Sequence, residues 1–153
     1  MGGRRVRLGG RVDRIDIRDD VFTVVDYKTG KPPTIKSQLA GQRVQVPLYL
    51  MAVEELLRNA GRNPVAAGGF FYHIRPGRAA VDGRFLRDIF RGMEVVGERQ
   101  KCLSEDEYAR AMEQIRERIG GLIGQVARGD FRVPADWSKG ACGHCPHGPL
   151  CRK

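Results

Sequence analysis

The segment from Leu8 to Gly30 constrains the fold of this chain most strongly, because it has the pattern of a β-hairpin. Apolar side chains recur at every second position on both arms, as in strands that bury one face. They are Val12, Ile15 and Ile17 on the first arm, and Val21, Phe22, Val24, Val25 and Tyr27 on the second. The polar run at residues 18–20 separates the arms, so we expect the chain to reverse between Asp19 and Asp20.

A symmetric turn at this point fixes which residues face each other across the hairpin, and it pairs Asp13 with Asp26. Directly opposed side chains lie about 4.5–5.5 Å apart at Cβ, where two like charges destabilise a sheet unless something compensates them. A divalent cation would compensate two carboxylates. The pattern therefore predicts that Asp13 and Asp26 form a cation site.

The alternation of side chains along a strand decides which neighbours join this site. Lys28 follows Asp26 by two residues and leaves the strand on the same face, whereas Tyr27 points to the other face. Asp16 has the opposite parity to Asp13, so we do not include it. The expected site therefore combines two carboxylates with one lysine.

The length and composition are those of one globular domain of 153 residues, with 41% hydrophobic and 29% charged residues. No apolar run approaches the roughly 20 residues that span a bilayer, and the chain does not open with the pattern of a signal peptide. We therefore expect a cytoplasmic protein that does not act at a membrane.

The net charge of +9 comes from 27 Lys and Arg against 18 Asp and Glu, and it favours a polyanionic partner, above all nucleic acid. Arginines gather on or near the first expected strand: Arg4, Arg5, Arg7, Arg11 and Arg14. They could contact backbone phosphates without reading the base sequence. Arginines are also common on the exposed edges of sheets, and basic residues can serve solubility alone.

A helical pattern begins near Ser37, with apolar residues Leu39, Val46, Leu50, Val53, Leu56 and Leu57. Pro47 leaves two alternatives, a helix that starts near Val46 with Pro47 in its first turn, or a longer helix from Ser37 that is kinked there. Gln45 and Tyr49 are four residues apart and share a face in both cases. They form either a solvated helix side or a polar patch beside the carboxylates.

The rest of the core predicts one further strand and two helices. Ala66–Ile74 is typical of a buried strand, in which a lone His73 is more often structural than catalytic. Phe85–Val96 is weakly helical. Ser104–Arg128 is the clearest helix, because it opens with a Ser-x-x-Glu capping box, carries an apolar stripe and ends before Gly129.

Three cysteines close the chain with the spacing C-x2-C-x5-C, namely Cys142, Cys145 and Cys151. A two-residue gap lets two thiolates reach one metal ion or cluster, and the third can fold back onto it. Structural disulfides are less expected because nothing in the sequence indicates secretion. The fourth ligand stays open between Cys102, His144, His147 and a residue outside this sequence.

Four motifs follow one another in the chain: G-x-V-D-R-I-D ending at Asp16, V-V-D-Y-K-T-G ending at Gly30, Q-x-x-x-Y from Gln45 to Tyr49, and the cysteine tail. With these motifs, residues 8–153 resemble the PD-(D/E)XK nuclease superfamily. The resemblance is greatest to the RecB-like nuclease domains of AddB-type helicase-nucleases and of CRISPR-associated four-cysteine nucleases.

The resemblance implies an α/β fold with a restriction-endonuclease-like core, in which helices flank a small mixed central sheet. We expect residues 1–133 to form this core and residues 134–153 to form a cysteine-rich metal-binding tail of the same domain. The first core helix of the family would precede residue 1, so we expect a core truncated at its N-terminus.

The resemblance also implies roles for individual residues. Asp13 and Asp26 would bind Mg2+ or Mn2+, the backbone carbonyl of Tyr27 would add a ligand, and Lys28 would position or activate the attacking water. Supporting or DNA-contacting roles would fall to Gln45, Tyr49, Arg11 and Arg14. The tail cysteines would hold an iron-sulfur cluster of the 4Fe-4S type, with zinc less expected.

The function that follows is a metal-dependent DNA nuclease, expected to be an exonuclease, that hydrolyses phosphodiester bonds in repair or recombination. A helicase domain or subunit is the expected protein partner. Two alternatives stay open: a nuclease-fold module that holds DNA ends without cutting, and a zinc-binding nucleic-acid module whose hairpin is ordinary sheet. The presence of all three of Asp13, Asp26 and Lys28 favours the enzyme.

Overall fold

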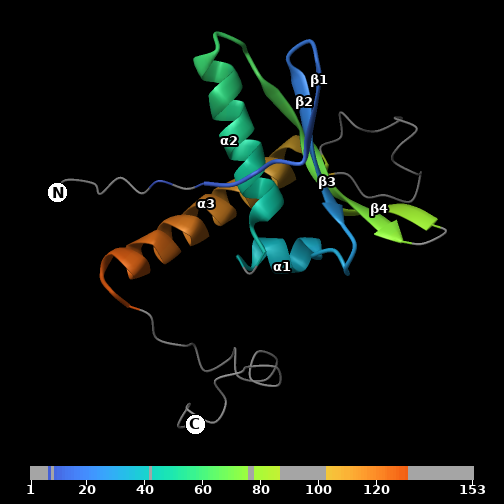
Figure 1. Cartoon of the computed structure of the whole chain (residues 1–153). Helices are drawn as coiled ribbons and strands as arrows, with labels where there is room; N and C mark the ends of the chain where they lie inside the picture. The colour runs from blue at the N-terminus through green and yellow to red at the C-terminus, as the bar shows by residue number, and fades with distance from the viewer. Residues whose placement is uncertain (1–6, 8, 42, 76–77, 87–102, 131–153) are drawn as a thin grey trace.

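The computed structural model describes residues 7, 9–41, 43–75, 78–86 and 103–130 (Figure 1). Its elements in chain order are β1 (Arg14–Arg18), β2 (Val21–Lys28), α1 (Ile35–Leu39), α2 (Gln45–Asn59), β3 (Val65–Arg75), β4 (Arg78–Leu86) and α3 (Glu105–Ala127). The expected cysteine-rich tail and its start at residue 134 lie outside the described residues.

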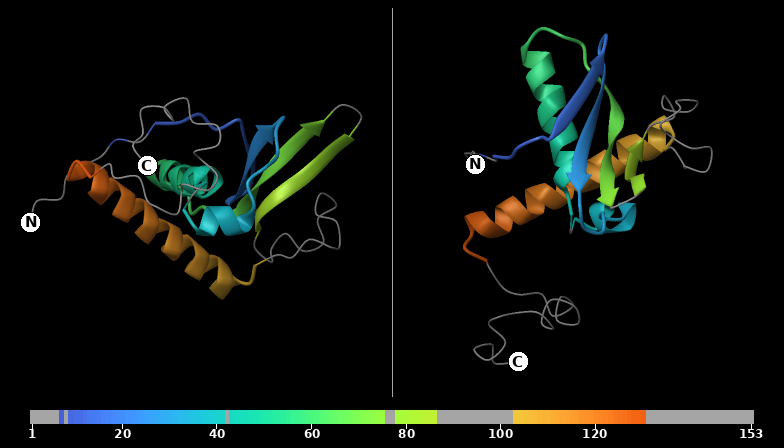
Figure 2. Two further views of the ribbon diagram at one scale, coloured as in Figure 1. Left: turned by 90° about the horizontal axis from the view of Figure 1, so that it is seen from below. Right: turned by 45° about the vertical axis from the view of Figure 1, so that its right-hand side comes forward.

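The four strands form one sheet in the order β1-β2-β3-β4. The β1/β2 and β3/β4 pairs are antiparallel and the central β2/β3 pair is parallel, so the sheet is mixed as expected. Helix α2 connects the two parallel strands and covers one face of the sheet, and α3 lies across the same side (Figure 2). This α/β arrangement is consistent with a restriction-endonuclease-like core.

The hairpin has the register that the sequence predicted. Arg14 pairs with Val25 and Arg18 with Val21, around a turn in which Asp19 has a φ of 54°. Asp16 pairs with Thr23 and therefore lies on the face that Asp26 does not share. Asp13 lies just before β1 and outside its paired residues, so its expected pairing with Asp26 stays a prediction.

The core lies between the sheet and the two long helices. Its largest side chains come from β2, β3, α2 and α3: Phe22, Val24, Phe71, Val46, Leu50, Met112 and Ile115. Gly69 of β3 is essential to this packing, because a Cβ there would lie 2.5 Å from Cγ1 of Val46. The missing side chain lets the first turn of α2 approach the sheet closely, which brings Gln45 near the end of β2.

The structure decides between the two alternatives for the helix around Pro47. Helix α1 ends at Leu39, Gly41 follows with a φ of 71°, and α2 begins at Gln45 with Pro47 as its third residue. Proline is tolerated in a first turn because the amide groups there have no partner within the helix. The alternative of a helix that starts near Val46 with Pro47 in its first turn is therefore confirmed.

The prediction of a weak helix over Phe85–Val96 is wrong at its start, because Phe85 and Leu86 belong to β4. Residues 87–96 lie outside the described residues. Strand β4 pairs antiparallel with β3, from Arg75 with Arg78 outward. A short apolar run has no reliable period of its own, so the pairing with an adjacent strand decides its conformation.

Helix α3 confirms the clearest sequence prediction. Ser104 accepts a hydrogen bond from the Glu107 amide and Glu107 accepts one from the Ser104 amide, which completes the capping box. Gly129 follows the helix with a φ of 70°. Among the helices described, none is both long and apolar enough to cross a bilayer.

Candidate active site

Asp26 is the centre of a polar cluster at the end of β2, on the face that α2 covers. Its side chain is only 2% exposed, so a charged carboxylate there needs partners from the protein. Gln45 donates from Nε2 to Asp26 Oδ1 at 2.8 Å, and Lys28 brings Nζ to 2.6 Å from Oδ2. The predicted placement of Lys28 beside Asp26 is therefore confirmed.

Gln45 connects every member of this cluster. Its Oε1 accepts from Lys28 Nζ at 3.0 Å, and its Nε2 lies 3.2 Å from the hydroxyl oxygen of Tyr49 as well as donating to Asp26. The amide is oriented by charge, because its oxygen faces the ammonium and its nitrogen faces the carboxylate. The first turn of α2 thus supplies a polar patch to the site, and the alternative of a merely solvated helix side is excluded for Gln45.

One oxygen of Asp26 contacts a charged group instead of a neutral donor. Oδ2 is buried, and among the described residues its partner is the Lys28 ammonium at 2.6 Å. A buried carboxylate with one ammonium and one amide as partners still carries a desolvation cost, which a coordinated cation would lower. Asp26 therefore has an oxygen whose environment suits a metal ligand.

Asp13 reaches the same end of β2 from the segment before β1. Its Oδ2 accepts a hydrogen bond from the Tyr27 amide at 3.0 Å, so the carboxylate lies at the peptide bond that follows Asp26. Asp13 is exposed. The structure thus places the Asp13 carboxylate at the backbone of β2, one residue from Asp26, and a cation shared by the two aspartates stays a prediction.

These donors fit Mg2+ or Mn2+ in chemical type. Within the described ranges, no group of three or more His, Cys, Asp or Glu side chains could hold a metal ion. Mg2+ commonly binds through one or two carboxylates and keeps several waters, so the carboxylates of Asp13 and Asp26 are donors of the right chemical type. The buried Asp26 carboxylate, whose Oδ2 contacts only the Lys28 ammonium among the described residues, is the observation that supports this fit.

Two of the predicted DNA-contacting arginines are not part of this cluster. Arg14 lies on the other face of the sheet, where Nε bonds Asp16 at 2.8 Å and Nη1 approaches the Tyr27 hydroxyl at 3.5 Å. The hydrogen bond to Asp16 and then that to Tyr27 raise the pKa of Arg14 further above its usual value. Arg11 is exposed ahead of β1. Phosphate contacts by either arginine stay a prediction.

His73 is buried in β3, and its Nε2 lies 3.4 Å from the carbonyl oxygen of Thr29. This contact, which holds the loop after β2, agrees with the structural role expected for a lone histidine. Phe71 is a residue that the sequence did not reveal as part of the site. Its ring lies 5.6 Å from Lys28 Nζ, so it supports the ammonium by a cation-π contact.

The site is a carboxylate-lysine centre at the end of a strand: it combines a buried aspartate, a lysine two residues later on that strand, and a glutamine from the first turn of α2. A family model described as the PD-(D/E)XK nuclease superfamily matches residues 1–152. The chain belongs to this superfamily. Searches of the curated proteins and of the solved structures found no significant match.

Membership implies nuclease activity on a nucleic-acid substrate, and nucleases of this superfamily typically use Mg2+ or Mn2+. The V-V-D-Y-K run that carried the sequence prediction holds Asp26 and Lys28 together at the end of β2.

Proposed function

We propose that this chain is an Mg2+- or Mn2+-dependent deoxyribonuclease, acting as an exonuclease in DNA repair or recombination. The single observation that carries the proposal is the buried Asp26 carboxylate, which has Gln45 on one oxygen and the Lys28 ammonium on the other. Such an arrangement is costly for stability alone and is useful for binding a cation.

Asp13 and Asp26 would hold the cation through their carboxylates, together with the backbone carbonyl of Tyr27. When bound, the cation would supply activation of the attacking water near neutral pH and neutralisation of charge on the phosphoryl oxygens. The hydrogen bond from the Tyr27 amide orients the Asp13 carboxylate before any ion binds.

Lys28 would act on the substrate side of the site. Its side chain is 30% exposed while Asp26 is buried, so the ammonium stands between the carboxylate and solvent. In that position it can donate to the attacking water or to a phosphate oxygen. Gln45 keeps the ammonium in place through Oε1, and Tyr49 restrains the Gln45 amide.

The test is digestion of single-stranded and duplex DNA by the full-length protein, with Mg2+ and with EDTA. Asp26→Ala is expected to abolish Mg2+-dependent digestion. Asp16→Ala is the matched control, because Asp16 is an aspartate of the same hairpin on the opposite face. Equal digestion by wild type and Asp26→Ala would refute the assignment, whereas DNA binding without any digestion would favour a module that holds DNA ends.

The finer assignment is to the RecB-like group, with a helicase domain or subunit as partner and a cytoplasmic location. We further propose that Cys142, Cys145 and Cys151 provide three ligands of a 4Fe-4S cluster in the intact protein, which their C-x2-C-x5-C spacing supports. Purified full-length protein should then be brown, with broad visible absorption. Colourless protein with stoichiometric zinc would contradict the cluster.

A further inference from the structure

A pocket of about 610 Å³ opens directly beside the carboxylate cluster. Lys28 and Gln45 belong to both, since they contact Asp26 and also line the pocket. The other walls come from the segment between β2 and α1, from α1 itself and from the segment before α2: Gly30, Lys31, Pro32, Pro33, Ser37, Arg43 and Val44. A ligand in this pocket would therefore be adjacent to the proposed reaction centre.

The charge of the pocket has one sign. Lys28, Lys31 and Arg43 line it, and no carboxylate does. Lys28 is paired with Asp26, but within the described part of the chain no ion pair joins Lys31 or Arg43 to an acidic side chain. By contrast, Arg14, Arg58, Arg62 and Arg116 each contact an Asp or Glu. The pocket thus carries two uncompensated cations.

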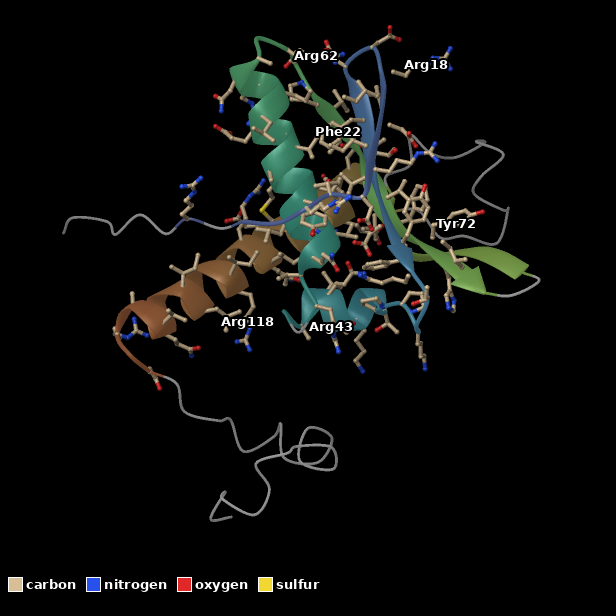
Figure 3. The ribbon with its side chains drawn as sticks, in the orientation of Figure 1. Arg18, Phe22, Arg43, Arg62, Tyr72 and Arg118 are labelled. Carbon is tan, nitrogen blue, oxygen red and sulfur yellow. The ribbon has the colours of Figure 1, made fainter. Side chains whose placement is uncertain are left out.

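The walls of the pocket are also stiff, which favours a defined ligand position. The two prolines have fixed φ angles, and Thr34 accepts a hydrogen bond from the Ser37 amide to hold the start of α1. Arg43 extends from the segment between α1 and α2, as Figure 3 shows. Its amide donates to the Ser37 carbonyl oxygen at 3.3 Å, which fixes the backbone that carries the guanidinium.

We infer that this pocket binds a backbone phosphate of the nucleic-acid strand, next to the phosphodiester that the carboxylate centre hydrolyses. The inference rests on the proposed function for the identity of its substrate. Lys31 and Arg43 contact the neighbouring phosphate and thereby fix the strand against Lys28. Because these contacts involve charge and no base edge, they hold the strand in register without selecting its sequence.

The test compares two variants with the same change in net charge. Lys31→Gln/Arg43→Gln removes both uncompensated cations of the pocket. Lys36→Gln/Arg18→Gln removes two exposed cations that do not line it, one on α1 and one at the tip of the hairpin. Binding of a fluorescein-labelled single-stranded 12-mer is followed by anisotropy over a series of salt concentrations, with Ca2+ in place of Mg2+.

The pocket variant is expected to bind about tenfold more weakly at low salt than wild type. The slope of log K against log salt should fall by about 0.7 for each phosphate of the single strand that the variant no longer neutralises. In digestion with Mg2+, its KM should rise at least fivefold while kcat stays within about twofold, because the pocket binds substrate without contacting the reacting atoms. The control variant should stay within about twofold of wild type in all three measurements.

Equal weakening in the pocket and control variants would overturn the inference, since general charge would then explain the binding. If wild type binds DNA but does not digest it, and the pocket variant alone binds more weakly, the nuclease proposal is refuted and the phosphate-binding role of the pocket is supported. Wild type that neither binds nor digests DNA would refute both.

Discussion

Replacement of Lys28 by Met tests whether the polar cluster is strained by its buried charge. The substitution keeps an unbranched side chain at position 28 and removes the ammonium, which lies over the Phe71 ring and is the only cation within ion-pair distance of Asp26 among the described residues. The buried carboxylate then keeps a single protein hydrogen bond, from Gln45. We therefore expect Lys28→Met to be less stable than wild type in the absence of metal.

The size of this destabilisation follows from the geometry. Breaking a fully buried ion pair by removing one partner costs about 3–5 kcal/mol. Lys28 is 30% exposed, so water can partly replace the ammonium, and we expect a smaller loss of about 2–3 kcal/mol, at or below the lower limit of that range. For a chain of this length that change lowers Tm by roughly 5–10 °C.

The assay is urea unfolding followed by circular dichroism, for wild type, Lys28→Met, Asp26→Asn and the double variant. In the double variant the buried charge is absent, so at least half of the stability that Lys28→Met loses should return. Non-additivity of about 1.5 kcal/mol or more in this cycle is expected for contacting partners. A Lys28→Met protein as stable as wild type, or strictly additive changes, would refute the reasoning.

Two further predictions concern how the fold presents the site. Gly69→Ala should lose about 1–3 kcal/mol of unfolding free energy in the same urea assay, because the new Cβ would overlap Val46 and push the start of α2 from the sheet. Gly30→Ala is the control, because its Cβ would meet nothing within 4 Å, and it should unfold as wild type does. Equal unfolding curves for the two variants would contradict this packing. Ser104→Ala removes half of the capping box and should lower the free energy of unfolding by about 1 kcal/mol. The control is Glu113→Ala on the exposed side of α3, which should lower it by less.

The hairpin and α3 could be predicted from the sequence because their signals are local. The turn at Asp19 and Asp20 fixes every pair of the hairpin once its centre is known, and the capping box at Ser104 marks the start of α3 within a residue. Strand β4 could not be predicted in the same way. Its conformation depends on pairing with β3, and its sequence has no alternation strong enough to exclude a helix.

The site was predictable where residues share a strand and less so where separate elements meet. Asp26 and Lys28 have fixed relative positions in any regular strand, so their common face followed from parity. The hydrogen bonds of Gln45 depend on where α2 begins and on how closely Gly69 lets it approach, and neither is a local property. Lys31 and Arg43 line the same pocket because the chain between them folds as α1. The spacing of the two residues in the sequence does not reveal this.

Direct measurement of Mn2+ binding tests the proposed joint role of Asp13 and Asp26. Full-length wild type, Asp13→Asn, Asp26→Asn and the control Asp16→Asn would each be titrated with Mn2+ and followed by electron paramagnetic resonance of the free ion. We expect wild type and Asp16→Asn to bind Mn2+ with equal affinity, and each of the other two variants to bind at least tenfold more weakly. Unchanged Mn2+ affinity in Asp13→Asn and Asp26→Asn would contradict a cation site between these two carboxylates.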